Sequence, residues 1–395
     1  MTRRFLLWLV LLPVFAAPSA PQRPYVVLVS LDGFRYDYAE RYGAPNLLAL
    51  AKAGASGELI PSFPSITFPN HISIVTGLYP EHHGIVANSF FDPARNQEYS
   101  MGHSASDGSW YRAKPLWVLA EEQNVKAAAM FWPTSDAEID GVRPSYWYRY
   151  DGKVPDEERV AHVLEWLKLP EKERPHFITL YFSDVDSAGH EFGPESSETA
   201  QAVRRVDGLI GGLWRQLQEL SLPVNLVVIS DHGMQSVQGF VNLSDYADLS
   251  HVRVENGGTF ALLYTPDAVI ADQTYRALKD KSPKFDVYRR SETPPAWHYS
   301  DNARIGDLVV IAREPTTLVT VTPTGNQEKG RHGYDPAQFR TMHAIFYAAG
   351  PNIGAGIRLS PFENVEIVPF LARILGLNVP VGLDGSGKPL DRALR

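Results

Sequence analysis

One almost wholly apolar run, from Tyr25 to Leu31, constrains the fold of this chain more than any other feature. The run is rich in valine, and it ends at the pair Asp32-Gly33. A strand that is apolar on both sides needs both faces of its sheet covered, which is the usual environment of strands in parallel sheets. The run therefore predicts a buried strand inside an α/β fold.

Similar runs alternate with helical segments along most of the chain. Further strands are predicted at residues 125–132, 176–182, 225–230 and 343–348. Helices are predicted at residues 46–54, 116–123, 156–169, 199–220 and 365–375. Strands that are separated by helices at this spacing pair in parallel through right-handed crossovers. We therefore expect a doubly wound α/β protein with a mostly parallel sheet flanked by helices.

The pattern changes between residues 256 and 324. Short apolar runs at 260–264, 285–288 and 308–312 surround one helical segment at 272–279, which predicts a small inserted α+β lobe. A tyrosine- and tryptophan-rich stretch at 145–150 is predicted to be a loop. The chain has 395 residues, of which 44% are hydrophobic, so a large core is possible. We expect residues 21–395 to form one domain that contains the lobe.

The N-terminus has the pattern of a secretory signal. Two arginines precede an apolar run from Phe5 to Ala17, and small residues follow up to Ala20. The run of about 13 residues is shorter than the roughly 20 that a membrane-spanning helix needs. We expect residues 1–20 to be a signal peptide whose cleavage leaves no membrane span, and an uncleaved anchor is the alternative.

Cysteine content and charge restrict the location and the partners. The absence of cysteine excludes disulfides and thiolate metal ligands. Export without disulfides is more typical of a bacterial periplasm than of a eukaryotic secretory route, so we expect a periplasmic or secreted protein. A formal net charge of −8 argues against binding of nucleic-acid polymers. Nothing in the sequence indicates a protein partner.

Acidic and histidine residues follow the predicted strands or lie where the main fold resumes. They are Asp32, Asp186, His190, Asp231, His232 and His332. Ligands bind beyond the carboxyl ends of the strands in open α/β sheets, so these residues are expected to meet. Each alone is also compatible with a helix cap, a surface histidine or an ordinary turn. Together, three carboxylates and three imidazoles without thiolates suit a pair of zinc ions, with manganese or iron as alternatives.

Thr67 lies in the stretch 61–71, where a loop ends and a helix can begin. Pro69 suits the first helical turn, because its missing N–H would be unpaired there. One interpretation is that Thr67 only caps this helix. The other is that Thr67 is a nucleophile, because a hydroxyl bound to a divalent cation can lose its proton.

The chain contains six short motifs: LDG at 31–33, PSITFPNH at 64–71, HGIVAN at 83–88, VDSAGH at 185–190 with GP at 193–194, SDHGM at 230–234 and HGYD at 332–335. Together they resemble the nucleotide pyrophosphatase/phosphodiesterases of the alkaline phosphatase superfamily, in particular the bacterial secreted members. The resemblance runs from Tyr25 to the C-terminus. It implies an alkaline-phosphatase-like fold and one catalytic phosphodiesterase domain.

The resemblance also implies roles for individual residues. One zinc ion would be held by Asp186, His190 and His332, and the other by Asp32, Asp231, His232 and the Thr67 oxygen. Asn88 matches a residue that hydrogen-bonds a non-bridging phosphate oxygen, although an ordinary turn would also suit it. Phe68 and Tyr150 match positions that sandwich a nucleobase, and simple packing is the alternative for Tyr150.

The activity implied by the resemblance is hydrolysis of nucleotide phosphodiester or pyrophosphate bonds. A phosphothreonine on Thr67 would form, and nucleoside 5′-monophosphates would be released. Two divalent cations and three aspartates leave a small positive charge, which suits a singly charged diester. The alternatives are a phospholipid- or choline-directed phosphodiesterase, since aromatic residues also bind quaternary ammonium groups, a phosphomonoesterase of the same superfamily, and a non-catalytic metal-dependent binding protein. A sulfatase is disfavoured, because Thr67 stands where a modifiable Cys or Ser would be needed.

Overall fold

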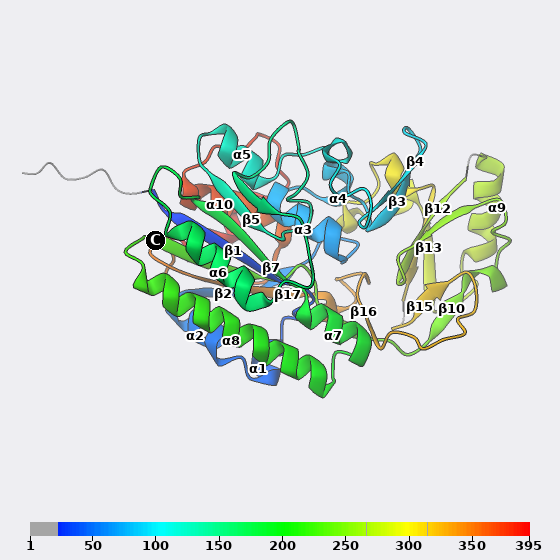
Figure 1. Cartoon of the computed structure of the whole chain (residues 1–395). Helices are drawn as coiled ribbons and strands as arrows, with labels where there is room; N and C mark the ends of the chain where they lie inside the picture. Colours follow the sequence, from blue (N-terminus) through cyan, green and yellow to red (C-terminus); the bar gives the residue numbers. More distant parts are fainter. Residues whose placement is uncertain (1–22, 266, 314) are drawn as a thin grey trace, which may run out of the picture.

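The computed structural model describes residues 23–265, 267–313 and 315–395 (Figure 1). The predicted signal peptide at residues 1–20 lies outside the described residues. Among the residues described, no helix combines the length and the apolar character that crossing a membrane requires. The described chain forms a large part built around one sheet and a smaller lobe at one end of that sheet (Figure 1).

Within the described residues, the central sheet has nine strands in the order β18-β2-β17-β8-β1-β7-β5-β6, and β19 also pairs with β2. The strands are β1 (Tyr25–Leu31), β2 (Ala55–Ile60), β5 (Ala127–Met130), β6 (Tyr146–Tyr148), β7 (Phe177–Phe182), β8 (Val224–Ile229), β17 (Ala344–Ala349), β18 (Ile357–Arg358) and β19 (Phe362–Glu363). The strands β8, β1, β7, β5 and β6 are parallel neighbours. The predicted parallel centre of the sheet is therefore present.

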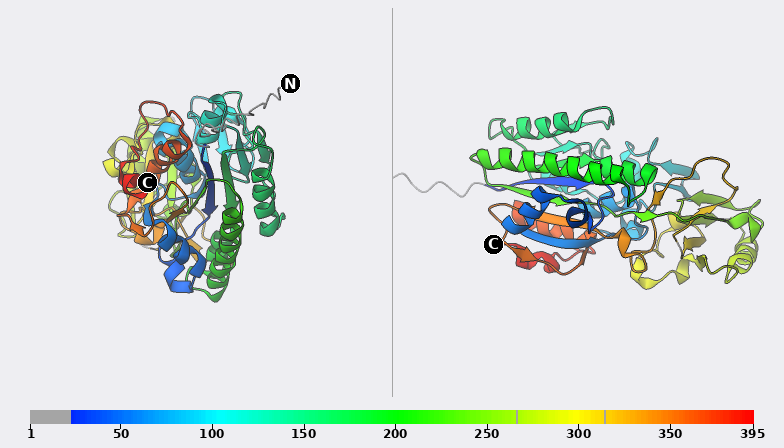
Figure 2. Two further views of the ribbon diagram at one scale, coloured as in Figure 1. Left: turned by 90° about the vertical axis from the view of Figure 1, so that its left-hand side faces the viewer. Right: turned by 90° about the horizontal axis from the view of Figure 1, so that it is seen from below.

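Helices cover both faces of the sheet (Figure 2). One layer holds α1 (Tyr38–Tyr42), α2 (Pro45–Ala53), α6 (Asp156–Leu167) and α8 (Ser197–Glu219). The other holds α3 (Thr67–Thr76), α5 (Leu116–Glu122) and α10 (Ile367–Leu375). Strand β1 explains the arrangement, because Val27 and Val29 pack with the first layer while Val26 and Leu28 pack with the second. Both faces of β1 are buried, as its apolar run predicts.

The lobe contains a four-stranded antiparallel sheet in the order β11-β12-β14-β13. Its elements are β11 (Arg253–Asn256), β12 (Phe260–Tyr264), α9 (Ala268–Leu278), β13 (Phe285–Arg289) and β14 (Leu308–Ala312). Leu278 of α9 packs with Leu263 and Phe285 of the sheet in a separate hydrophobic core. A short ribbon of β10 (Phe240–Asn242) and β15 (Thr317–Val319) lies at the lower edge of the lobe in Figure 1.

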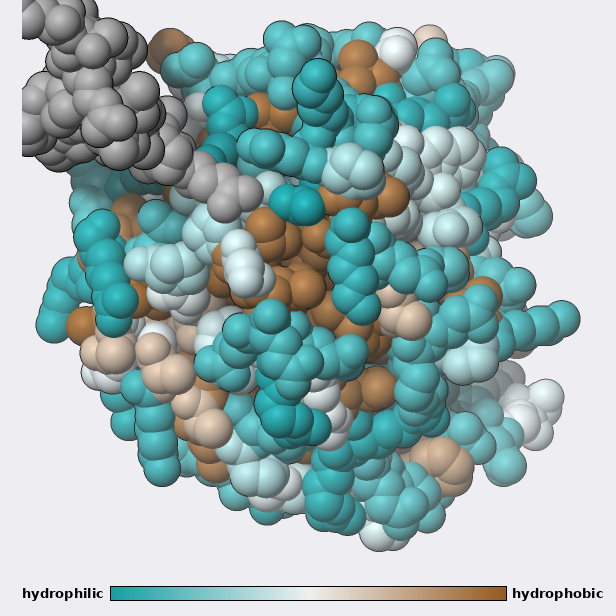
Figure 3. Space-filling view, turned by 60° about the vertical axis from the view of Figure 1, so that its left-hand side comes forward, coloured by the Kyte–Doolittle hydropathy of each residue, from teal (hydrophilic) through white to brown (hydrophobic). Residues whose placement is uncertain are grey.

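Shorter elements connect the two parts. The strands β3 (Ser89–Asp92) and β4 (Gln97–Ser100) form a hairpin after α4 (Pro80–His83). The strand β9 (Gln235–Ser236), which follows β8, pairs with β16 (Gly330–Arg331) where the chain returns from the lobe. The face of the main part that lies away from the lobe is mostly hydrophilic, and hydrophobic residues gather near its centre (Figure 3).

The structure differs from the sequence-based expectations at three strands. Residues 146–148, predicted to be a loop, form the edge strand β6, and their aromatic side chains suit a pleated surface. The strand β2 was not predicted, because most of its residues are only half-buried and lack an apolar pattern. The strand β17 is antiparallel to both β8 and β2. The chain re-enters the sheet from the lobe, at the end where the parallel strands finish, so it runs back in the opposite direction.

Candidate active site and metal centre

The six predicted carboxylate and imidazole ligands converge beyond the carboxyl ends of β1, β7 and β8. Asp32 directly follows β1, and Asp231 and His232 follow β8. Asp186 and His190 lie on α7 (Asp184–Phe192), which begins after β7. His332 follows β16. The structure thus places residues from distant parts of the chain at the edge of the sheet where ligands bind in α/β folds.

The six residues form two overlapping groups. Ligand atoms of Asp32, Asp231 and His232 all lie within 4.8 Å of one another, as do those of Asp186, His232 and His332. His190 adjoins the second group, because its Nε2 lies 3.4 Å from Asp186 Oδ1 and 3.0 Å from His332 Nε2. His232 stands between the groups, and its ring stacks on that of His332 at a centroid distance of 3.7 Å.

Two glycines allow the elements of the site to approach closely. Gly33 follows Asp32 with φ of +68°, and a Cβ there would lie 2.8 Å from the Asp186 Cα. A Cβ on Gly330 would lie 2.3 Å from the carbonyl oxygen of Gly189 on α7. Both distances are too short for a side chain. The glycines therefore bring α7 against the end of β1 and against β16.

Each aspartate has one buried carboxylate oxygen that lacks a hydrogen bond within the described residues. These oxygens are Asp32 Oδ1, Asp186 Oδ1 and Asp231 Oδ2. The Asp32 and Asp231 oxygens lie 3.5 Å and 3.1 Å from the Nε2 atom of His232. The Asp186 oxygen lies 3.5 Å from the Nε2 atom of His332. A buried carboxylate oxygen without a partner is unfavourable. A cation among these oxygens would supply the missing interaction.

The histidines are oriented as metal ligands usually are. The Nδ1 atom of each lies near a backbone carbonyl oxygen, at 3.0 Å for His190, 2.9 Å for His232 and 3.2 Å for His332. An Nδ1–H that donates to a carbonyl leaves the Nε2 lone pair free for a cation. A tetrahedral ion with ligand bonds of about 2.0–2.1 Å keeps its ligand atoms about 3.3 Å apart. The distances in this site match that spacing, so the residues fit divalent cations of the zinc type.

Neighbouring charges shift the pKa values of the site in both directions: Asp186 outweighs burial and raises the pKa of His190 to about 10, and Asp231 likewise raises that of His232. Two further shifts agree with bound cations. Burial, together with the charges of Asp231 and Asp186, raises the pKa of Asp32 well above its ordinary value. Burial and the two neighbouring histidines lower the pKa of His332 well below its ordinary value. The first shift reflects repulsion among carboxylates, which a divalent cation would relieve. The second favours the neutral imidazole that a cation requires.

Thr67 is the first residue of α3, and Ile66 occupies the N-cap position without a side-chain hydrogen bond. The Thr67 hydroxyl therefore does not cap the helix, and the cap-only interpretation is wrong. Its Oγ1 instead lies 3.2 Å from the Nε2 of His232. The hydroxyl of Thr67 is thus placed against the group formed by Asp32, Asp231 and His232.

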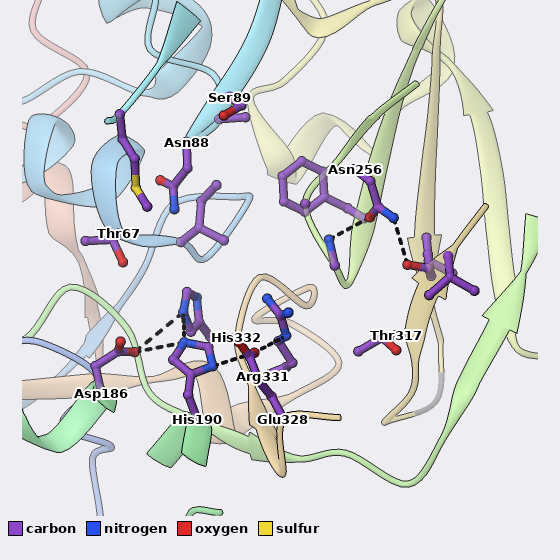
Figure 4. A pocket seen from close by; sticks show the side chains of 18 of the residues that line it. Thr67, Asn88, Ser89, Asp186, His190, Asn256, Thr317, Glu328, Arg331 and His332 are labelled. Carbon is purple, nitrogen blue, oxygen red and sulfur yellow. Dashed lines mark hydrogen bonds and ion pairs between the residues drawn. The ribbon is translucent and has the colours of Figure 1, made fainter. Parts of the chain in front are cut away.

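Asn88 lies beside Thr67 in the loop before β3. Its Oδ1 accepts a hydrogen bond of 3.0 Å from the backbone N–H of Phe68, at the start of α3. This bond fixes the amide, and its nitrogen points into the cavity next to Thr67 (Figure 4). The N–H groups of Asn88 therefore face the space where a ligand would lie.

Phe68 and Tyr150 line one cavity of about 660 Å³, which also reaches Asp32, Thr67 and Asp186. Tyr150 is 51% exposed. Its ring packs edge-on against Phe131 and Tyr181, with centroid distances of 5.4 Å and 6.0 Å, and it also lines the cavity. The two predicted base-binding residues are therefore in one cavity, and Tyr150 also has a packing role. We call this space the aromatic cavity.

Several residues that support the site were not predicted. Tyr181 donates a hydrogen bond of 2.6 Å to Asp32 Oδ2. His71 places its Nδ1 2.9 Å from the Thr67 carbonyl oxygen and 3.3 Å from Asp231 Oδ2. Glu328 Oε2 lies 3.0 Å from His190 Nδ1. The position of His71, one helical turn after Thr67, could have revealed it, whereas Tyr181 resembles an ordinary core residue of a strand.

Comparisons with known proteins identify the family of the chain. The family model of type I phosphodiesterase/nucleotide pyrophosphatase matches residues 26–335. Human ectonucleotide pyrophosphatase/phosphodiesterase family member 1 is 38% identical over 399 residues, which cover 96% of this chain and 42% of that protein. An uncharacterised pyrophosphatase/phosphodiesterase of Schizosaccharomyces pombe is 39% identical over 373 residues, covering 89% of this chain and 77% of that protein. The chain thus spans about two-fifths of the length of the mammalian relative.

Solved structures give the same result. Murine ectonucleotide pyrophosphatase/phosphodiesterase 5, solved as an inactive threonine-to-alanine variant in complex with AMP, superposes with a TM-score of 0.88 and 30% identity, covering 94% of this chain and 100% of that chain. This similarity confirms the predicted alkaline-phosphatase-like α/β fold. The particular resemblance to bacterial secreted members stays a prediction. The chain belongs to the type I phosphodiesterase/nucleotide pyrophosphatase family.

Proposed function

We propose that the chain hydrolyses nucleotide phosphodiester or pyrophosphate bonds and releases nucleoside 5′-monophosphates, with Thr67 as the nucleophile. The position of the Thr67 hydroxyl carries this proposal. It makes no cap, faces the group around His232, and lies where the aromatic cavity begins. The murine relative supports the proposal, because its inactive form lacks one threonine and is in complex with AMP.

The donor set indicates how cations would be held. Asp32, Asp231, His232 and Thr67 would hold one, and Asp186, His190 and His332 the other. The nitrogen and oxygen ligands, without thiolates, favour zinc. Two bound divalent cations would lower the pKa of the Thr67 hydroxyl and of water, and would offset negative charge on the reacting phosphate.

The residues of the chain would then act in two displacements. The Thr67 Oγ forms a bond to phosphorus while the bond to the leaving oxygen breaks on the opposite side, and the hydroxyl proton passes to solvent. Asn88 donates from its Nδ2 to a non-bridging oxygen, where negative charge increases in the transition state. Water next attacks the same phosphorus, and Thr67 regains its proton as it leaves. Phe68 and Tyr150 hold the base throughout.

A substrate panel tests this proposal. Nucleoside triphosphates, NAD and dinucleotides are expected to yield nucleoside 5′-monophosphates. Glycerophosphocholine and simple phosphate monoesters are expected to react with a kcat/KM at least about 100-fold lower, since they lack a base for the aromatic cavity. Chromatography with mass detection identifies the products. Preference for the choline ester or for monoesters would replace the nucleotide assignment with one of the two alternatives.

His71 is expected to be a positioning residue for one cation. It is fully buried, and its Nε2 lies 2.9 Å from the Ser30 Oγ, while its Nδ1 lies close to Thr67 O and Asp231 Oδ2. Outer partners of this kind typically change metal affinity about 10- to 100-fold. His71→Asn should therefore weaken zinc binding by about that factor in a chelator competition. The same change at exposed His251 is the control, and equal affinity in both variants would exclude this role.

A further inference from the structure

A second cavity, of about 580 Å³, opens from Thr67 on the side of the lobe (Figure 4). It shares Thr67 and Asp186 with the aromatic cavity but contains neither Phe68 nor Tyr150. Its far wall comes from the lobe and includes Asn256 and Thr317. Cavities of this size hold small-molecule ligands. We call this space the lobe cavity.

The proposed chemistry gives the lobe cavity a role. In an in-line displacement the leaving oxygen lies opposite the attacking Thr67 Oγ, near the second group of ligands. His190 and His332 of that group line the lobe cavity and do not line the aromatic cavity. A substrate whose base lies between Phe68 and Tyr150 would therefore direct its leaving group into the lobe cavity.

Arg331 gives this cavity a positive group. Its guanidinium points into the space between Asn88 and Asn256 (Figure 4). The Nε side is paired with Glu328, which also contacts Nδ1 of His190. Within the part of the chain that the structure describes, neither terminal nitrogen of Arg331 has a hydrogen-bond partner. The ion pair holds the guanidinium beside Glu328 and leaves its terminal N–H donors directed at the cavity.

Two other polar side chains that line the lobe cavity are already occupied. Asn256 donates from Nδ2 to the Leu318 carbonyl at 2.9 Å and accepts from the Gly258 N–H at 2.8 Å. Glu328 is paired with both Arg331 and His190. Arg331 is therefore the positively charged side chain of this cavity whose N–H donors can reach a ligand. A guanidinium binds phosphate oxygens strongly.

We propose that the lobe cavity is the leaving-group site and that Arg331 binds a phosphate of the leaving group. The chain would then favour substrates that release a phosphate-bearing group, such as nucleoside triphosphates and dinucleoside polyphosphates, over those that release a simple alcohol or phenol. This inference rests on the proposed nucleotide hydrolysis. It adds that the lobe cavity binds the leaving-group half of the substrate.

Thymidine triphosphate and the 4-nitrophenyl ester of thymidine 5′-monophosphate form a matched pair, because they share the nucleoside and differ in the leaving group. Arg331→Gln should lower kcat/KM for the triphosphate about 10- to 100-fold more than for the nitrophenyl ester, the size expected for a charge-assisted hydrogen bond. Arg331→Lys keeps the charge but loses the planar pair of N–H donors, so its effect should be intermediate. Inorganic pyrophosphate should also bind Arg331→Gln more weakly, by about tenfold or more in calorimetry.

Arg313→Gln is the matched control, because Arg313 is an exposed arginine of the lobe that does not line the cavity. It should change the ratio of the two kcat/KM values by less than about twofold. The zinc content of each variant is measured in parallel. Equal losses on both substrates, or unchanged pyrophosphate binding in Arg331→Gln, would overturn the role of Arg331 and leave the proposed function intact. If the unmodified protein hydrolyses neither substrate, the proposed function itself fails, and the inference fails with it.

Discussion

Thr67→Ala is expected to lower kcat for a nitrophenyl nucleotide diester by at least about 10³-fold, because it removes the atom that attacks phosphorus. The zinc content should stay close to that of the unmodified protein, since Asp32, Asp231 and His232 remain in place. The fold should also persist, because Thr67 does not cap α3. Steady-state kinetics and elemental analysis of the same preparation measure both effects.

Thr67→Ser is the matched control for this experiment. Serine keeps the hydroxyl at the start of α3, next to His232 Nε2, and should retain a substantial part of the activity. If the alanine variant turned over as fast as the unmodified protein, the nucleophile would be another group. If the serine variant were as inactive as alanine while folded and loaded with metal, a hydroxyl alone would not explain the chemistry.

Removal of divalent cations is expected to have an effect of similar size. A chelator should abolish turnover, to below about 10⁻³ of the starting rate, because the Thr67 hydroxyl then keeps its ordinary high pKa. Zinc should restore the activity, and the apo protein should unfold at a lower temperature, since a bound cation stabilises the folded state. Full activity in a preparation without metal would exclude the two-cation centre.

Two aspartates test the assignment of ligands. Asp231→Asn removes a carboxylate from the group around His232 and should lower both zinc content and activity. Asp335→Asn is the control, because Asp335 is also buried but accepts a hydrogen bond from the N–H of Ala337 and belongs to neither cation group. Similar zinc loss in both variants would show that the effect comes from general destabilisation.

The main elements of the fold follow from local sequence patterns, whereas others depend on tertiary contacts. The strand β1 is recognisable because both of its faces are apolar. The strand β2 is not, because its half-buried residues gain their order from pairing with β17, which is distant in the sequence. The antiparallel direction of β17 depends on where the lobe returns the chain, and that position is set by the fold of the lobe.

The same division applies to the site. Asp32, Asp231 and His232 could be predicted because they directly follow strands whose ends meet at one edge. The contact of Glu328 with His190, and through it the orientation of Arg331, arises only when the segment after the lobe packs against α7. No periodicity or spacing in the sequence encodes such a contact.

The stereochemistry at phosphorus tests the central claim most directly. A nitrophenyl ester of a thymidine 5′-phosphorothioate with defined chirality is hydrolysed in water enriched in one oxygen isotope, and the configuration of the released nucleoside 5′-phosphorothioate is determined. Two in-line displacements, the first by Thr67 and the second by water, predict net retention. Net inversion would mean that water attacks the substrate directly, and Thr67 would then not be the nucleophile.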